Sequence, residues 1–374
     1  MSKNKNHKTI LISSNYAWTI FNFRMGLIKR LKDEGFKVVV LTEFDGYESK
    51  ILKEVDEVLP LFISRKGINP FIDVITIFSY IKAILYVKPC TILLFTVKPV
   101  IYGSIASKLT KVKSISMITG LGTAFIKNSW LTGLVKYLYR KSLSSSPTTF
   151  FQNTSDRDLF LEHKLINPNS WKITPGSGID LDKFKYSEQL DKGELIFLFV
   201  GRILKDKGII EFINAAKIIK KKFPYIRFQL LGPTATENRT AISSREMKEW
   251  VDDGVIEYLG VTDDISYFLK RASCIVLPSY REGTSRALLE SAAVGRPLIA
   301  SDVPGCKEII DDKKSGFLCK VRDHKDLASK IENMVKLSYE ERVLMGKNGR
   351  LKIENEYNQD IVSDLYIEAI KKIN

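Results

Sequence analysis

Histidine, paired cysteine and long apolar runs are all scarce in this sequence of 374 residues. Its three histidines, His7, His163 and His324, lie far apart in the sequence, so a histidine-rich metal centre is not expected. The four cysteines form no C-x-x-C pair, and Cys90 and Cys274 open apolar runs. That pattern favours reduced, buried thiols of a cytosolic protein over disulfides or a zinc site.

No stretch reaches 18 uninterrupted apolar residues, which argues against a transmembrane helix. Residues 71–87 come closest, but Asp73 and Lys82 interrupt them. Near the N-terminus, early lysines precede an apolar run at 9–12 that is too short for the core of a signal peptide. We therefore expect a first strand there and no export.

Acidic residues are scarce in the first half of the chain. Residues 1–185 hold 27 Lys and Arg against 14 Asp and Glu, whereas the remainder holds 31 against 29. Nearly all of the formal net charge of +15 therefore belongs to the first half. Such a basic half favours an anionic partner, which could be nucleic acid, an acidic membrane or a phosphorylated substrate. The alternative is a lysine-rich proteome, in which a mildly basic surface has no functional meaning.

Glycine is absent from the first strand-to-helix loop at 13–18, so the usual dinucleotide-binding fingerprint is missing there. What is present is a repeated alternation of short apolar strands with helical segments. In the first half we expect strands at 9–13, 37–41, 58–63, 92–95, 114–118 and 148–152, and helices at 21–32, 71–86, 101–109 and 130–143. This alternation predicts α/β architecture with parallel, doubly wound sheets.

The second half repeats the same pattern after a polar linker that begins near Gly176. A length of 374 residues is enough for two cores. We therefore predict two Rossmann-like domains with parallel sheets facing across a cleft. The expected division is 1–184, 185–357, and a C-terminal helix at 358–374 that returns to the first domain.

Two strand-to-helix loops of the second half carry the chemistry. The buried strand at 195–200 leads into Gly201-Arg202, and Lys207-Gly208 then precedes a helix. Cations in such a loop make an anion site at a helix N-terminus, although the same pattern is as often a solvated basic loop.

The second loop follows the strand that begins at Cys274. Glu282 lies in it, and Glu290 lies one to two turns into the next helix, with seven residues between them. Between the two carboxylates, the amides of residues 283–285 lie at a helix N-terminus, which attracts phosphate. A solvated helix with two unrelated glutamates is the alternative, because this spacing is a loose pattern.

Taken together, these loops resemble the retaining, GT-B-fold glycosyltransferases of family four. The resemblance extends over most of the chain. Within the family, the chain is similar to the bacterial subgroup that adds sugars to undecaprenyl-diphosphate-linked acceptors in capsule, O-antigen or protein-glycan synthesis. The segments that carry the subgroup resemblance are 21–24, 95–99, 102–104, 119–122, 151–153 and 176–180.

The resemblance implies donor-side roles. Arg202 and Lys207 would clamp the diphosphate of a nucleotide sugar, and no metal or other cofactor is then expected because two fixed cations supply the stabilisation. Glu290 would accept hydrogen bonds from the ribose, and Glu282 would orient the donor sugar. The other donor-side residues implied are Gly201, Gly283, Thr284, Ser285, Thr119, Gly120 and, near the base, Val261.

One departure from the family concerns Thr119, which stands where many members place a histidine. The bacterial subgroup shows the same Thr-Gly-Leu-Gly form, and a front-face mechanism, in which the departing phosphate takes the acceptor proton, needs no general base. On the acceptor side we predict Asn15, Arg24 and Lys98; the lysine could equally be a solvated loop residue. A D-x-D pair at 180–182 imitates a metal motif but lies in the predicted linker.

We therefore expect a retaining, metal-independent glycosyltransferase that moves a sugar, with N-acetylhexosamine favoured, from a UDP-sugar to a polyprenyl-diphosphate-linked saccharide. The alternatives are a UDP-sugar epimerase or hydrolase of the GT-B type and a non-catalytic anionic-ligand-binding protein. No nucleic-acid partner is expected, since no recognised binding module is present.

The expected location is cytoplasmic, at the inner face of the cell membrane. The segments 71–86 and 130–143 combine apolar or aromatic residues with nearby cations, as an interfacial helix on anionic lipid requires. Either one could instead be an ordinary helix packed on its sheet.

Overall fold

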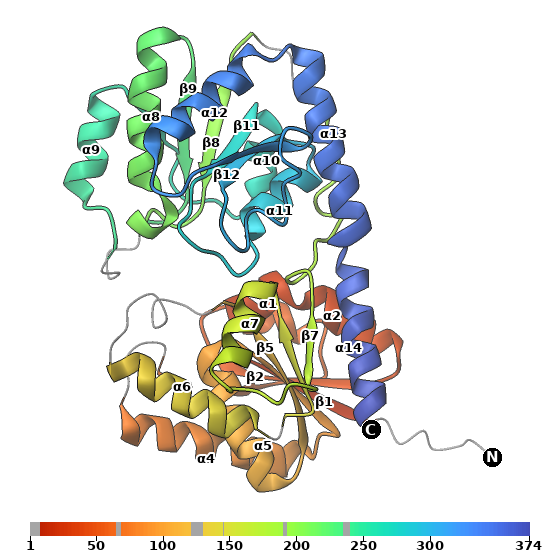
Figure 1. Ribbon diagram of the computed structural model, residues 1–374. Coiled ribbons are helices and arrows are strands. Elements are labelled where there is room, and N and C mark those ends of the chain that lie inside the picture. The colour runs from red at the N-terminus through yellow and green to blue at the C-terminus, as the bar shows by residue number, and fades with distance from the viewer. Residues whose placement is uncertain (1–7, 65–68, 121–129, 145, 190–192, 235–239) are drawn as a thin grey trace. The chain divides into compact units, whose positions relative to one another are not determined.

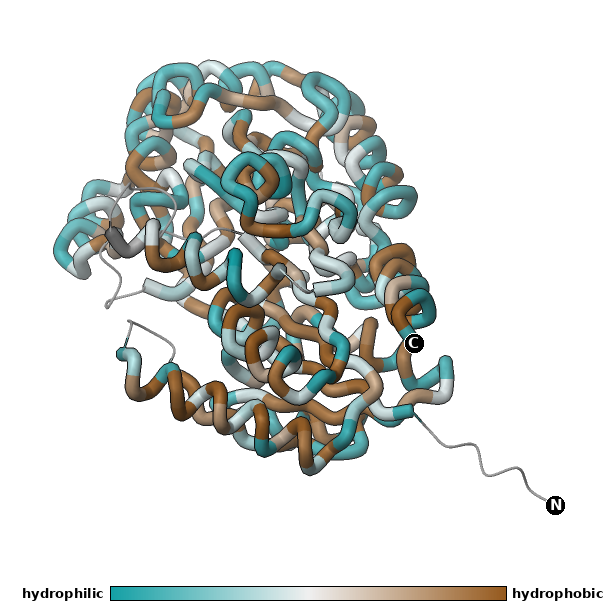
Figure 2. The backbone as a smooth tube through the Cα atoms, turned by 60° about the horizontal axis from the view of Figure 1, so that its bottom comes forward, coloured by the Kyte–Doolittle hydropathy of each residue, from teal (hydrophilic) through white to brown (hydrophobic). Residues whose placement is uncertain are grey.

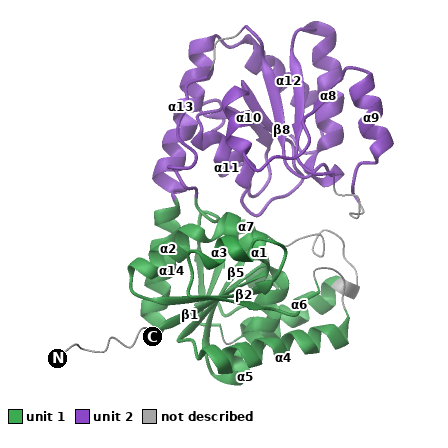
Figure 3. Cartoon of the chain, turned by 180° about the vertical axis from the view of Figure 1, so that it is seen from behind, with its two compact units in different colours: residues 1–178, 359–374 green, residues 179–358 purple. Residues whose placement is uncertain are grey.

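The computed structural model describes residues 8–64, 69–120, 130–144, 146–189, 193–234 and 240–374. Internal packing divides the chain into two compact units (Figure 3). Unit 1 comprises Met1–Gly178 with Gln359–Asn374, and unit 2 comprises Ile179–Asn358. The division falls six residues before the position expected from the sequence, and the last helix belongs to unit 1.

Unit 1 contains a parallel seven-stranded sheet in the order β3-β2-β1-β4-β5-β6-β7 (Figure 1). Its central strands consist mostly of hydrophobic residues, which are brown in Figure 2. The side chains of these residues are buried, as expected of a sheet covered on both faces. The strands are β1 (Thr9–Tyr16), β2 (Lys37–Glu43), β3 (Glu57–Pro60), β4 (Thr91–Phe95), β5 (Lys113–Ile118), β6 (Thr148–Phe151) and β7 (Trp171–Ile173).

Two layers of helices cover this sheet. Helices α4–α7 form one layer, whose side chains build a core with strands of the sheet. Helices α1–α3 and α14 form the other layer, whose side chains build a second core with the sheet. The helices are α1 (Ala17–Phe23), α2 (Met25–Asp33), α3 (Glu48–Leu52), α4 (Pro70–Val87), the π-helical turn η1 (Pro99–Gly103), α5 (Ser104–Thr110), α6 (Trp130–Leu143), α7 (Thr154–Glu162) and α14 (Gln359–Ile373).

Unit 2 contains a parallel six-stranded sheet in the order β10-β9-β8-β11-β12-β13. Its strands are β8 (Ile196–Val200), β9 (Arg227–Leu231), β10 (Glu257–Tyr258), β11 (Cys274–Leu277), β12 (Leu298–Ser301) and β13 (Gly316–Cys319). Its helices are η3 (Lys205–Lys207), α8 (Ile209–Lys222), α9 (Ser244–Asp252), α10 (Ile265–Arg271), α11 (Arg286–Ala293), α12 (His324–Lys336) and α13 (Tyr339–Glu356).

Two parallel α/β units confirm the predicted fold class, and the departures are local. The helix predicted at 21–32 is two helices, because the backbone at Arg24 leaves the helical conformation. The helix predicted at 101–109 begins as η1 and continues as α5. No range was predicted for strand β7 or for helices α3, α7, α9 and α10; β7 has only three residues, too few for a periodic pattern.

Helix α4 departs from the general pattern because it is apolar on nearly all sides. Asn69 caps its N-terminus by accepting hydrogen bonds from the amides of Phe71 and Ile72, and Pro70 occupies its first turn. Within the described part of the chain, α4 is the one helix whose length and composition would suffice to cross a membrane, despite Asp73 and Lys82; 28% of it is buried in the structure.

Candidate active site

The predicted donor residues of unit 2 follow two adjacent strands, β8 and β11, at the centre of the sheet. Strand β8 pairs with β9 on one side and with β11 on the other, so the strand order reverses between β8 and β11. In parallel α/β sheets, ligands bind at the carboxyl ends of the strands beside such a reversal. Arg202 and Lys207 follow β8, and Glu282 follows β11.

Gly201 and Gly208 give the loop after β8 its shape. Gly201 has a φ of 151°, and Gly208 has a φ of 75°; residues other than glycine rarely adopt such angles. A Cβ on Gly208 would also collide with the carbonyl oxygen of Pro278, at the end of the neighbouring strand. The glycine thus lets the loops after β8 and β11 approach each other.

The amine of Lys207 donates to the carboxylate of Glu282, which joins these two loops by an ion pair. Both side chains are mostly buried, with 20% and 12% of their surface exposed. Arg202, five residues earlier, has no ion pair with any carboxylate in the part of the chain that the structure describes. One predicted cation is therefore paired with a predicted carboxylate, and the other is available to an anion.

Residues 282–285 pack against the loop after β12. The amide of Glu282 donates to the carbonyl of Pro304 at 3.2 Å, and the amide of Ser285 donates to the carbonyl of Gly305 at 2.8 Å. Gly305 has a φ of 82°, and a Cβ there would collide with the carbonyls of Glu282 and Gly283. The Ser285 amide thus donates its hydrogen bond within the protein. Of the three amides predicted to surround the sugar and phosphate, at most those of Gly283 and Thr284 could donate to a ligand.

Glu290 lies on α11 and forms an ion pair with Arg286, whose Nε lies 2.7 Å from its Oε1. The Glu290 side chain is 12% exposed, so it is not the solvated carboxylate of the alternative interpretation. Arg286 was not predicted as a site residue, although its i, i+4 spacing from Glu290 is a signal that the sequence contains.

Val261, predicted to lie near the base, follows β10 and is 67% exposed. Close backbone contacts link the ends of the strands leading to it: the amide of Gly232 donates to the carbonyl of Gly260 at 2.9 Å. A Cβ on Gly232 would collide with the carbonyl of Gly201. Val261 therefore lies at the same edge of the sheet as Arg202, two strands away from β8.

A second group at this edge was missed in the sequence. The hydroxyl of Tyr280 donates to the carboxylate of Glu211 at 2.8 Å, and the guanidinium of Arg322 lies 4.5 Å from the Tyr280 ring centroid. Burial, together with the hydrogen bond to Glu211, raises the pKa of Tyr280 to about 12. The three side chains tie the elements after β8, β11 and β13 together; no motif indicates this, because each residue follows a different strand.

In unit 1 the predicted residues also gather at one edge of a sheet. Asn15 lies at the end of β1, Lys98 follows β4 and Thr119 and Gly120 follow β5, and these three strands are neighbours. The amine of Lys98 lies 3.2 Å from a carboxylate oxygen of Asp73, on α4. Lys98 is therefore neither a solvated loop lysine nor an unpaired cation in this structure.

Arg24 lies inside unit 1, with 2% of its surface exposed. Its guanidinium carbon lies 4.0 Å from the ring centroid of Phe95, and Nη2 lies 3.5 Å from the sulfur of Met117. The structure thus packs the Arg24 guanidinium against an aromatic ring, a cation–π arrangement that stabilises the fold.

The D-x-D pair forms a local turn, since Oδ1 of Asp180 accepts hydrogen bonds from the amides of Asp182 and Lys183. Among the described residues, no group of three or more His, Cys, Asp or Glu side chains is placed to hold a metal ion.

Comparison with known proteins matches both halves of the chain. Residues 180–352 match the family model described as glycosyl transferases group 1, and residues 9–153 match the model described as glycosyl transferase 4-like.

Three curated proteins are similar over most of their length. The chain is 29% identical to the N,N'-diacetylbacillosaminyl-diphospho-undecaprenol alpha-1,3-N-acetylgalactosaminyltransferase of Campylobacter jejuni, over 96% of this chain and 97% of that protein. It is 28% identical to the capsular polysaccharide biosynthesis glycosyltransferase CapM of Staphylococcus aureus, over 90% of each chain. It is 27% identical to a UDP-Gal:alpha-D-GlcNAc-diphosphoundecaprenol alpha-1,3-galactosyltransferase of Escherichia coli, over 72% of this chain and 73% of that protein.

Solved structures agree in fold. A glycosyltransferase from Rickettsia africae superposes with a TM-score of 0.79 at 18% identity, over 98% of this chain and 99% of that one. HepE from Anabaena, solved with UDP and glucose, superposes with a TM-score of 0.79 at 14% identity, over 98% and 100% of the two chains. At such low identity the likeness shows the fold alone.

Proposed function

This chain belongs to the group 1 glycosyl transferases of the GT-B fold, and on that premise we propose that it moves a sugar from a UDP-sugar to a saccharide carried on undecaprenyl diphosphate. The acceptor class is supported by the names of the relatives from Campylobacter jejuni and Escherichia coli, which both act on diphospho-undecaprenol-linked sugars. A UDP donor is supported by the HepE structures, which hold UDP or UDP-glucose.

The observation that carries the proposal is the Lys207–Glu282 ion pair beside Arg202 at the reversal of strand order. We infer that the diphosphate of the donor takes the place of Glu282 as the partner of Lys207, while Arg202 forks onto the same phosphates. Glu282 then becomes free to accept hydrogen bonds from hydroxyls of the donor sugar. The ion pair keeps both side chains in place until the donor arrives.

Two fixed cations make a metal ion unnecessary in this account. As the bond between the anomeric carbon and the phosphate oxygen breaks, negative charge grows on the diphosphate, and Arg202 and Lys207 stabilise it. The acceptor hydroxyl oxygen forms the new bond to the anomeric carbon, and its proton passes to the departing phosphate oxygen. Attack from the face of the leaving group retains the configuration and requires no general base, which agrees with a threonine at position 119.

An N-acetylhexosamine is the donor sugar that we favour, because the Campylobacter relative, similar over 96% of this chain, is named for transferring N-acetylgalactosamine. The Escherichia relative is named as a galactosyltransferase. The donor panel below therefore contains both kinds of sugar.

A membrane surface as partner is supported by unit 1. Its α4 exposes a stripe of apolar side chains at helical spacing, with Phe71 81% and Phe78 66% exposed. Such a stripe beside lysines suits a helix that rests on anionic lipid. We propose that unit 1 holds the enzyme at the inner face of the cell membrane, where a polyprenyl-linked acceptor is presented.

The test is a panel of UDP-sugars offered with a synthetic polyprenyl-diphosphate saccharide, with the anomeric configuration of the product determined by NMR. We expect one UDP-N-acetylhexosamine to be transferred with retention. An inverted product would contradict the front-face mechanism. A changed UDP-sugar without an acceptor product would favour an epimerase, and no turnover of any donor would favour a binding protein.

A further inference from the structure

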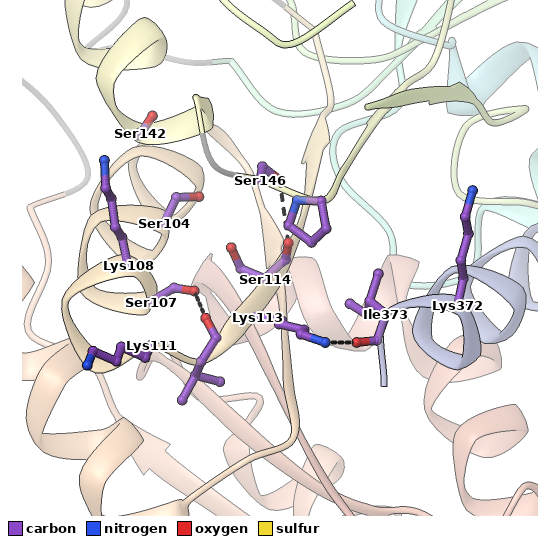
Figure 4. A pocket seen from close by; sticks show the side chains of 12 residues that line it. Ser104, Ser107, Lys108, Lys111, Lys113, Ser114, Ser142, Ser146, Lys372 and Ile373 are labelled. Carbon is purple, nitrogen blue, oxygen red and sulfur yellow. Dashed lines mark hydrogen bonds between the residues drawn. The ribbon is translucent and has the colours of Figure 1, made fainter. Parts of the chain in front are cut away.

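A basic hollow lies in unit 1 at the amino-terminal edge of its sheet, opposite to the edge that carries the predicted site residues. It measures about 450 Å³, within the range of roughly 300–1,000 Å³ that is usual for ligand pockets. Four lysines line it: Lys108 and Lys111 at the end of α5, Lys113 at the start of β5 and Lys372 at the end of α14 (Figure 4). Among the described residues that line the hollow, none is acidic.

The sequence around the hollow contains cations without anions. Between Asp73 and Asp156 there is no Asp or Glu, and the same span holds ten Lys and Arg residues. This span includes α5, α6 and all but the first turn of α4, which cover one face of the sheet. Because carboxylates normally intersperse with lysines on a soluble surface, a span with cations only indicates an anionic partner.

Helix dipoles do not account for the cluster. Three helices, α5, α6 and α14, end at the hollow, and each C-terminus carries the equivalent of about half a negative charge. Together they offset less than two of the four lysine charges. Lys113, moreover, begins a strand, and its amine donates to the carbonyl of Ile373.

Serine hydroxyls in the wall of the hollow already donate hydrogen bonds inside the protein. Ser107 donates to the carbonyl of Val112, and Ser142 donates to the carbonyl of Tyr139 at 3.1 Å. The serines therefore shape the hollow, and the lysines supply its charge. In the described part of the chain, Lys108 and Lys111 have no ion pair, and neither has Lys372.

One carboxylate, that of Glu368, interacts electrostatically with Lys372. Glu368, one turn earlier on α14, has its pKa lowered first by a hydrogen bond from Lys172, and Lys372 contributes only a smaller effect. The Glu368 carboxylate lies 2.9 Å from the Lys172 amine. Glu368 is therefore paired mainly with Lys172, and it neutralises little of the positive charge of Lys372.

We propose that this hollow binds a phosphate group, which the positive charge of Lys108, Lys111 and Lys372 attracts; their side chains lie apart in Figure 4, so they act through their summed field. The phosphate can belong to the headgroup of an anionic phospholipid or to a free phosphorylated compound. Exposed Leu109 lies between Lys108 and Lys111 in the sequence, and α4, which packs against α5, ends with exposed Leu85 and Tyr86. This part of unit 1 thus combines cations with exposed apolar side chains, as a lipid surface requires. The site goes beyond the proposed transfer reaction, because it lies at the other edge of the sheet.

The test compares two triple variants of the full chain that lose the same charge. The hollow variant is K108Q/K111N/K372Q; asparagine is chosen at 111 because the φ of 58° there suits it. Lys113 is left unchanged, since its amine supports the end of α14. The control is K29Q/K37Q/K53Q, which changes exposed lysines on α2, β2 and the end of α3.

Binding is measured to vesicles of phosphatidylcholine alone, to vesicles that also contain phosphatidylglycerol, and to free glycerol phosphate and inorganic phosphate. We expect the hollow variant to lose at least about tenfold in affinity for a phosphate probe, and the control to stay within about twofold of the wild type. Loss confined to the phosphatidylglycerol vesicles identifies a lipid headgroup, whereas loss for the free phosphates identifies a soluble ligand.

Equal losses in the two variants would overturn the proposal, because diffuse charge would then explain the binding. Absence of binding of every phosphate probe to the wild type would also overturn it. Sugar transfer to an acceptor in detergent, which bypasses the vesicle, is expected to stay unchanged in both variants, and melting temperatures check that both fold. A failure of the transfer assay alone therefore contradicts the proposed function and not this site.

Discussion

The amine of Lys207 and the carboxylate of Glu282 form an ion pair across the two central strand-to-helix loops of unit 2. This pair lies beside Arg202, at the reversal of strand order. A nucleotide diphosphate that displaced Glu282 would meet Lys207, which the ion pair already holds in place, and Arg202, which follows the same strand. Preorganisation of this kind is what makes electrostatic stabilisation effective, since no reorganisation is needed during the reaction.

Removal of either cation is expected to slow transfer strongly. Arg202→Ala and Lys207→Ala should each lower kcat about 100- to 1,000-fold, because each removes a charge that stabilises the departing diphosphate. The matched control is Lys205→Ala on the same turn, whose amine lies 3.9 Å from Glu246 and is half exposed. Steady-state kinetics should show the control within about twofold of the wild type. Equal effects at all three positions would contradict the clamp.

Glu290 is expected to act on the donor and not on stability. Glu290→Gln should weaken UDP binding about tenfold, because a hydrogen bond from ribose to a charged acceptor is stronger than one to a neutral amide. The control is Glu249→Gln, which disrupts another i, i+4 pair in the same unit, with Arg245. Calorimetry with UDP should separate the two variants; similar affinities would remove Glu290 from the donor site.

Thr119→Ala is expected to leave transfer within a few-fold of the wild type. The proposed mechanism passes the acceptor proton to the departing phosphate, so the side chain at this position carries no proton. Measurement of kcat together with UDP affinity checks this. If transfer were abolished while UDP binding stayed intact, a direct catalytic role for this loop would replace the front-face account.

Gly208→Ala is expected to lower the free energy of unfolding by about 2–5 kcal/mol, because a left-handed φ is combined with a collision against Pro278. Gly35→Ala is the control: its φ is 83°, but a Cβ added there would meet only open space, so about 1 kcal/mol is expected. Urea unfolding of both variants gives the comparison. Equal losses would show that the two loops after β8 and β11 do not need this close approach.

The apolar stripe of α4 is expected to govern attachment to vesicles. Phe71→Ser with Phe78→Ser should lower binding to anionic vesicles, because both side chains are exposed and both are large. The control replaces Leu344 and Leu351, which are exposed at the same seven-residue spacing on α13 of unit 2. A sedimentation assay in which the two double variants behave alike would contradict the membrane role of unit 1.

Much of the fold was predictable because its elements are regular. The helix at 130–143 and the strand at 114–118 follow strong periodic or continuous apolar patterns, and the structure places α6 and β5 there. Strand β7 was missed because three residues form no pattern. At Arg24, where the predicted helix breaks, the side chain packs against Phe95, some seventy residues away, and no local pattern reports such a contact.

The candidate site was predictable as a set of residues but not as a set of contacts. Arg202, Lys207 and Glu282 lie in two loops whose strands are neighbours, and Glu290 lies on the helix after the second loop, as the alternation of strands and helices predicted. Their pairing was not predictable, because the Lys207–Glu282 contact joins positions far apart in the chain. The hydrogen bond from the Ser285 amide to the Gly305 carbonyl was unpredictable for the same reason, since Gly305 lies in a third loop.

The most direct test of the central claim is the mass of the polyprenyl-diphosphate acceptor after incubation with a UDP-sugar, together with the amount of UDP released. The wild type should increase the acceptor mass by one sugar residue and release one UDP for each, and the Arg202→Ala/Lys207→Ala double variant should do neither at a comparable rate. UDP released at the same rate with and without acceptor, with no change in acceptor mass, would contradict the assignment as a transferase acting on this class of acceptor.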